Sequence, residues 1–150
     1  MIMGLFDMLS VSASGLSAER QRAEVASTNL ANAETTHTDT GGPYTRKEVV
    51  FSASNPTFTT VLNRMGRFGH GSAGSVQVTQ VVEDTTPPVM HYEPGNPDAD
   101  KNGMVAYPAI NPVSEMVDMM GAVRSYQMNA SAVNAAKQMI QQSIDILKTT

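Results

Sequence analysis

The chain has no cysteine among its 150 residues. A disulfide framework, a thiolate metal site and a cysteine nucleophile are therefore excluded. Basic residues are also scarce, because Lys and Arg total 10 and form no cluster larger than the pair Arg46-Lys47. Affinity for nucleic acid comes largely from neutralised phosphates, so we expect no nucleic-acid partner for a chain with a net charge of −4.

Long hydrophobic runs are missing too. No segment approaches the roughly eighteen consecutive apolar residues of a membrane-spanning helix, so we expect no insertion into a membrane. The apolar start at residues 1–9 lacks a basic leading segment and a small-residue cleavage site, which predicts that no signal peptide is cleaved. If the protein works outside the cytoplasm, another export route must carry it.

Charged residues make up only 16% of the chain, well under the typical quarter. A surface this poor in charge suggests that much of it faces other protein rather than water. A soluble surface rich in Ser, Thr and Asn explains the same composition equally well.

All eight prolines lie between Pro43 and Pro112. Because proline breaks the interior of a helix, the two flanks can be helical whereas the middle cannot be one helix. We predict a mainly α fold with a small β-rich middle, in which two long terminal helices form a coiled-coil-like hairpin. The expected segments are an N-terminal helix with its loop (1–36), a middle module of short strands and turns (37–111) and a C-terminal helix (112–150).

The C-terminal flank carries the stronger helix pattern. Asn111 is a good N-cap, and Pro112 suits the first helical position, where its missing N–H costs nothing. An apolar seam with alternating spacings of three and four then continues for more than four heptads, and only Lys137 breaks it. Small and neutral polar residues beside the seam favour a second buried face. The seam residues are Met116, Met119, Val123, Tyr126, Ala130, Val133, Ile140, Ile144 and Leu147.

The N-terminal flank has a weaker pattern of the same kind. Apolar residues recur every seven positions at Leu9, Leu16, Ala23 and Leu30, and Gly15 costs roughly 1 kcal/mol against alanine inside a helix. We therefore expect this helix to need a partner, and we predict that the two seams are the assembly interface of the protein. One seam alone is marginal against the entropy of ordering a helix, so we predict frayed termini in the isolated monomer.

The middle of the chain has three candidate strands, at residues 46–51, 58–62 and 76–81, and a glycine-rich loop at 64–75. The pair Pro87-Pro88 and the segment 94–97 suggest extended or turning chain rather than the centre of a sheet. We expect a modest β region that leans on the helices.

Three patterns suggest chemistry but lack its context. Residues 69–74 match a phosphate-binding glycine loop, but no buried strand precedes them and no helix follows. Residues 98–103 begin like a calcium loop, but Ala109 stands where the bidentate carboxylate belongs, so we predict a turn. The three histidines have no metal-ligand spacing. We predict no catalytic residue, no cofactor and no metal, although a dispersed active site is invisible to motif reading.

Two segments carry a family resemblance. The first is Ser14-Gly15-Leu16-Ser17-Ala18, and the second is Asn29-Leu30-Ala31-Asn32, followed by Thr35. Both resemble the N-terminal signature of bacterial flagellar rod and hook proteins. Two further segments resemble the proximal-rod C type within that family, namely Gly41-Gly42-Pro43-Tyr44 and Glu93-Pro94-Gly95-Asn96-Pro97. Mild departures from that type stand at Asn96, Met104 and Ala109.

The resemblance implies a structural subunit of the flagellar basal-body rod and no enzymatic activity. Such a subunit leaves the cytoplasm unfolded through the flagellar export apparatus and joins a helical tube across the periplasm. Its partners would be other copies of itself, other rod proteins and the basal-body rings. The signature loop, comprising Asn29, Leu30, Ala31, Asn32 and Thr35, is expected to cap the helix end and to stiffen the bend for torque transmission.

Three alternatives remain open from the sequence. The chain could be another axial subunit of the rod and hook family. A second class is a secreted effector or enzyme whose small middle domain carries the chemistry, with the glycine-rich loop and the histidines as its only support. A third is a cytoplasmic helical adaptor.

Overall fold

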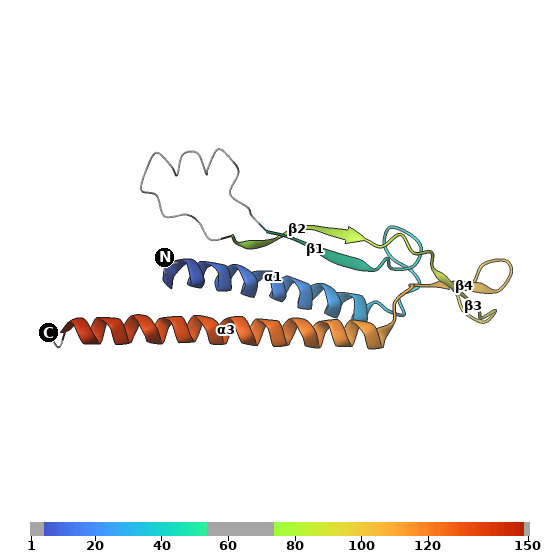
Figure 1. Ribbon diagram of the computed structural model, residues 1–150. Coiled ribbons are helices and arrows are strands. Elements are labelled where there is room, and N and C mark those ends of the chain that lie inside the picture. The colour runs from blue at the N-terminus through green and yellow to red at the C-terminus, as the bar shows by residue number, and fades with distance from the viewer. Residues whose placement is uncertain (1–4, 54–73, 149–150) are drawn as a thin grey trace, which may run out of the picture. The chain divides into compact units, whose positions relative to one another are not determined.

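The computed structural model describes residues 5–53 and 74–148, except for the side chains of Leu5, Phe6 and Leu147. Within these residues lie a helix, four strands and a longer helix (Figure 1). The prediction of a mainly helical fold with a small β-rich middle is confirmed. The elements are α1 (Leu5–Ala31), β1 (Lys47–Ala53), β2 (Val76–Glu83), β3 (Val89–Tyr92), β4 (Met104–Tyr107) and α3 (Pro112–Lys148).

The start of α3 follows the predicted capping chemistry. The side-chain Oδ1 of Asn111 accepts the backbone N–H of Val113 at 3.0 Å and that of Ser114 at 3.4 Å. These bonds satisfy two of the N–H groups that a helix leaves unpaired at its first turn. No helix in the described part of the chain is long and apolar enough to cross a membrane.

The strands form two separate two-stranded sheets. β1 and β2 coincide with the predicted strands at 46–51 and 76–81, and they pair with each other. β3 pairs with β4 in antiparallel register, with Val89 opposite Tyr107. The second pair was not predicted, because prolines surround it. In the structure these prolines flank the strands rather than interrupt them, so no ladder hydrogen bond is lost. The predicted strand at 58–62 lies outside the described residues, as does nearly all of the glycine-rich loop.

The turn between β3 and β4 uses the side chain of Asp100. Its Oδ1 accepts the N–H groups of Asn102 at 2.7 Å and Met104 at 2.9 Å, as predicted for a turn in this segment. Gly103 has a positive φ of 74°, and a Cβ at this position would lie 3.1 Å from side-chain atoms of Pro94 and Tyr92. A larger residue here would therefore adopt a strained conformation and would crowd Pro94 and Tyr92.

The chain forms two compact units. The first unit contains residues 1–20, 51–79 and 123–150, and the second contains residues 21–50 and 80–122. Segments of α1 and α3 meet antiparallel in the second unit, where Arg22 pairs with Asp118 at 3.1 Å and Asn29 bonds Glu115 at 3.0 Å. The three segments expected along the chain (1–36, 37–111 and 112–150) remain a prediction.

Small residues are the most deeply buried apolar side chains of the helices inside each unit. In the first unit Ala18 and Ala136 are buried, and a Cβ on Gly15 would lie only 2.8 Å from Nδ2 of Asn129. In the second unit Ala26 and Ala122 are buried. Burial of one methyl group is worth only about 0.8 kcal/mol, so these helix contacts are close but contribute little apolar stabilisation.

Candidate functional site

A buried side chain near the end of α1 organises the polar part of the second unit. Asn29 is 1% exposed. Its Nδ2 donates to the carbonyl of Lys47 at 2.8 Å and to Oε2 of Glu115 at 3.0 Å. Its Oδ1 accepts the N–H of Lys47 at 3.0 Å and the hydroxyl of Tyr44 at 3.1 Å. Because a carboxamide has two donors and two acceptor sites, every hydrogen-bonding position of Asn29 is used.

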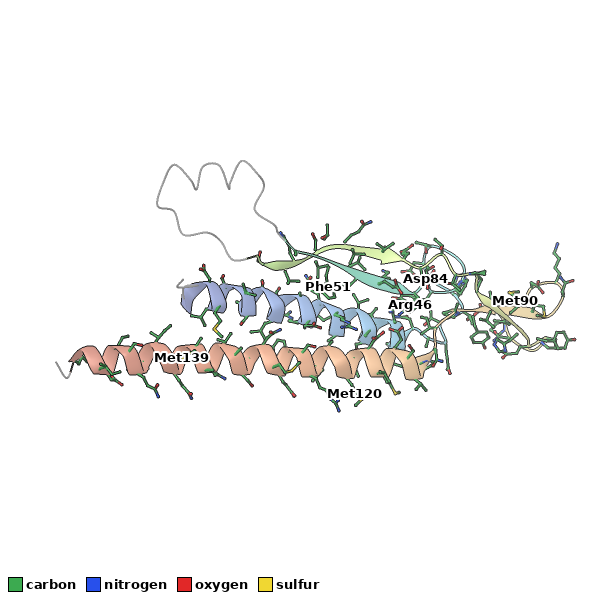
Figure 2. All side chains as sticks on the ribbon, in the orientation of Figure 1. Arg46, Phe51, Asp84, Met90, Met120 and Met139 are labelled. Atoms are coloured by element: carbon green, nitrogen blue, oxygen red, sulfur yellow. The ribbon has the colours of Figure 1, made fainter. Side chains whose placement is uncertain are left out.

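Glu115, in the first turn of α3, is the second buried polar residue and is 2% exposed. Its Oε1 accepts a hydrogen bond from Nε of Arg46 at 2.7 Å, while Oε2 is held by Asn29. Arg46 also pairs with Glu48 and approaches Asp84 at 3.9 Å. Figure 2 labels Arg46 and Asp84, which lie side by side. A buried carboxylate costs several kcal/mol unless it is paired and hydrogen-bonded, and here both oxygens are engaged.

We call Asn29, Tyr44, Arg46 and Glu115 the Glu115 cluster. Burial lowers the pKa of Arg46, but the hydrogen bonds and negative charges of Glu115 and Glu48 outweigh burial and raise it overall. Burial, followed by the negative charge of Glu115, raises the pKa of Tyr44. Both groups therefore keep their protons near neutral pH, and Tyr44 remains a donor to Asn29.

The signature loop follows directly from the end of α1. Asn32 Nδ2 donates to the carbonyl of Thr28 at 2.9 Å, and Thr35 Oγ1 donates to Oδ1 of Asn32 at 3.1 Å. The expected capping of the helix end by short polar side chains is therefore present. Leu30 is half-buried and Ala31 is exposed in the last turn of α1. The role of this loop in stiffness remains a prediction.

An exposed apolar patch covers the beginning of α3. Its residues are Val113, Met116, Val117 and Met120, and each is between 47% and 67% exposed. Spacings of three and four place them on one helix face. Met120 is labelled on α3 in Figure 2. Contiguous apolar surface of this kind is typical of sites that contact another protein. We call these four residues the Val113 patch.

The predicted interface residues divide between the units and differ in exposure. In the first unit three of these residues are exposed, namely Val123, Tyr126 and Ile144. Five others in that unit are half-buried, namely Leu9, Leu16, Ala130, Val133 and Ile140. In the second unit Met116 is exposed, and those that are half-buried are Ala23, Leu30 and Met119. The side chain of Leu147 lies outside the described residues. None of the described side chains in this set is fully buried. Their role as an assembly interface remains a prediction.

Sequence reasoning missed the Glu115 cluster. A glutamate in the first turn of a helix is already explained by the helix dipole, and the sequence marks Arg46 only as part of a small basic pair. One signal could have found the buried face, because Glu115, Ala122, Asn129 and Ala136 recur every seven residues. Three of these four are buried, and the fourth, Asn129, is half-buried.

The described residues contain no group of three or more His, Asp or Glu side chains that could hold a metal ion. In the turn at residues 98–103, Asp100 is occupied by backbone N–H groups, and Asp98 accepts the hydroxyl of Thr36 at 2.7 Å. These carboxylates therefore serve as hydrogen-bond acceptors that shape the loop.

Comparisons with known proteins cover both ends of the chain and nearly its whole length. Residues 9–36 match the family described as flagella basal body rod protein, and residues 101–146 match the C-terminal family of flagellar basal body rod FlgEFG proteins. The chain is 40% identical over 151 residues to the flagellar basal-body rod protein FlgC of Bacillus subtilis, covering 97% of this chain and 100% of that protein. It is 36% identical over 157 residues to FlgC of Borreliella burgdorferi, covering 97% and 99%. It is 37% identical over 145 residues to FlgC of Salmonella typhimurium, covering 96% and 98%.

Proposed function

Since the chain belongs to the FlgC family of flagellar basal-body rod proteins, we propose that it is a rod subunit that assembles with its neighbours into a helical tube and transmits torque across the periplasm. Its role is structural rather than enzymatic. In support, the buried carboxylate of Glu115 is fully engaged by Arg46 and Asn29, which suits a group that holds elements together. Its partners are other copies of itself, other rod proteins and the surrounding basal-body rings.

The observation that carries this proposal is the separation of two faces on α3. The face of small residues is used within the chain, whereas large apolar side chains of the same helix remain exposed. A folded chain gains nothing from exposed Val and Met, but each such side chain is worth about 1.5–3 kcal/mol when it becomes fully buried. Assembly with neighbouring subunits would provide that burial.

Export in an unfolded form through the flagellar export apparatus also belongs to the proposal. The buried apolar residues among those described are four alanines, Val105 and Pro108, a core that supplies little stabilisation to a lone chain. The absence of cysteine removes disulfides that would have to be opened before unfolded passage. Folding would then be completed by contact with neighbours at the growing rod.

The Glu115 cluster supports the part of the proposal that concerns torque. A bend that is fixed by hydrogen bonds with every donor and acceptor used resists deformation better than one fixed by apolar contacts, which are non-directional. Asn29 and Arg46 connect α1, the approach to β1 and the first turn of α3 in this way. Asn32→Ala tests the neighbouring loop, because unchanged assembly, stiffness and swimming in that variant would contradict a role for the capping bonds.

Complementation of cells that lack this chain tests the proposal. Val117→Asp introduces a charge in the Val113 patch and should abolish swimming, because a buried unpaired carboxylate opposes assembly. The matched control is Ser131→Asp, an exposed polar position of the same helix, which should swim normally. Both variants should retain the circular dichroism spectrum of the unassembled wild-type chain. Normal swimming with Val117→Asp would contradict the proposed assembly surface.

A further inference from the structure

A groove in the second unit has both apolar and acidic character. It has a volume of about 470 Å³ and is lined by apolar groups that include Val89, Pro108 and Ile110, together with the carboxylates of Glu34 and Glu93. Val89 is 47% exposed, so the apolar lining is accessible to another molecule. A groove with these two kinds of group suits a side chain that is aliphatic along its length and polar at its tip.

The charge in this groove is negative and uncompensated within the described part of the chain. Glu93 Oε2 accepts hydrogen bonds from the Tyr107 hydroxyl at 3.1 Å and from Asn96 Nδ2 at 3.1 Å, but both donors are neutral. Neither Glu34 nor Glu93 forms an ion pair with any residue that the structure describes. The hydrogen bond to Glu93, followed by burial and the nearby negative charges, raises the pKa of Tyr107.

The chemistry of the groove therefore fits a lysine or arginine side chain. Both carry an aliphatic stem that packs on apolar surface while the charged head reaches a polar rim. Here the stem would lie on Val89 and Ile110, and the head would approach Glu34 and Glu93. An acidic or purely apolar partner would leave either the carboxylates or the apolar lining unmatched.

Lys137 of α3 is a cation that lacks such a partner. It is exposed and forms no ion pair with the rest of the described chain. It is also the only break in the apolar seam, with Val133 and Ile140 on either side. A lysine at a seam position reduces the stability of helix packing but can specify one register, provided that a carboxylate meets it.

We infer that Lys137 of one copy of this chain occupies the groove lined by Glu34, Glu93 and Val89 of a second copy. The inference rests on the proposed assembly and adds a specific contact to it. The two surfaces are different and lie on different units, so the contact is heterologous. Repetition of a heterologous contact produces an open filament rather than a closed dimer, as a rod requires.

Cysteine cross-linking tests this contact in a chain that has no native cysteine. Val89→Cys and Gln141→Cys would be carried by separate chains, which are expressed together in cells that lack the native chain. Gln141 is exposed and lies one helical turn beyond Lys137. A short bismaleimide added to isolated basal bodies should join the two chains in a dimer that contains one of each. Lys101→Cys, in an exposed loop of the second unit, replaces Val89→Cys in the control and should give no dimer with Gln141→Cys.

Charge exchange provides a second measurement. Lys137→Glu should abolish swimming, and the added changes Glu34→Lys and Glu93→Lys should restore it. Glu83→Lys, at an exposed carboxylate outside the groove, is the control and should not rescue Lys137→Glu. The inference would be overturned if the two lysine changes failed to restore swimming. It would also be overturned if Val89→Cys became cross-linked to Met128→Cys, which lies beside Arg124, or to a different rod protein. The proposed function fails separately, if the wild-type chain is absent from isolated basal bodies.

Discussion

Removal of the Asn29 side chain is the perturbation whose effect the structure specifies most fully. Asn29→Ala deletes four hydrogen bonds, to both backbone groups of Lys47, to Tyr44 and to Glu115. Asn29→Asp keeps the shape of the side chain but replaces the donating amide by a carboxylate, which cannot donate to Lys47 or Glu115. The two variants therefore separate the loss of packing and bonding from a change of charge.

The expected magnitudes follow from those bonds. Three are neutral and contribute about 0.5–1.5 kcal/mol each, while the bond to the Glu115 carboxylate contributes about 1.5–3 kcal/mol. Water that enters the vacated space recovers a part, so Asn29→Ala should lower the free energy of unfolding by about 3–5 kcal/mol. Asn29→Asp should cost more, because it places a second negative charge beside Glu115, and two charges this close repel by about 4 kcal/mol at an effective dielectric constant of 20.

Urea unfolding of the purified chain, followed by circular dichroism, measures these differences. Hydrogen exchange of the Lys47 amide provides a local measure, since its N–H donates to Asn29. The matched control is Asn134→Ala, an exposed asparagine on α3, which should change the stability by less than about 0.5 kcal/mol. If Asn29→Ala stays within about 1 kcal/mol of the wild type, or if Asn29→Asp is the milder variant, the buried network does not organise the second unit.

Three further predictions concern neighbouring groups. Arg46→Met leaves Glu115 buried without its cation and should destabilise the chain by about 3–5 kcal/mol, whereas combining Arg46→Met with Glu115→Leu should recover most of the loss in urea unfolding. Because the pKa of Tyr44 is raised in the folded chain, its stabilising contribution is fully present below pH 10.0 and is lost as pH rises through the raised value. A series of unfolding measurements at alkaline pH should show this loss in the wild type and not in Tyr44→Phe. Gly15→Ala improves helix propensity, but the added methyl group collides with the amide of Asn129, so this variant alone should have nearly the stability of the wild type. In an Asn129→Ala background the same change should stabilise the chain by about 1 kcal/mol, as urea midpoints would show.

Local patterns predicted the parts of the fold that depend on local chemistry. Asn111 and Pro112 predicted the start of α3, and alternating valines predicted β2. The β3–β4 pair was missed because nearby prolines suggest interrupted strands, whereas proline can also lie just beyond the end of a strand. Its prolines lie just outside the strands, so the ladder remains intact.

The polar cluster was beyond the reach of sequence patterns for a different reason. Arg46 and Glu115 stand 69 positions apart, and Asn29 and Glu115 stand 86 apart. No periodicity relates residues at such separations, and a glutamate in the first turn of a helix has a sufficient local explanation in the helix dipole. By contrast, the apolar seam was visible because it repeats along one helix. The structure adds that part of this seam is left uncovered within the chain, since Val123, Tyr126 and Ile144 are exposed.

Cryo-electron microscopy of the intact basal body is the most direct measurement of the central claim, that the exposed apolar face of α3 is covered by neighbouring subunits. The account predicts that Val113, Met116, Val117 and Met120 of each copy are buried against helices of adjacent subunits in the rod wall. A rod in which this chain is present but these four side chains face solvent would contradict the claim.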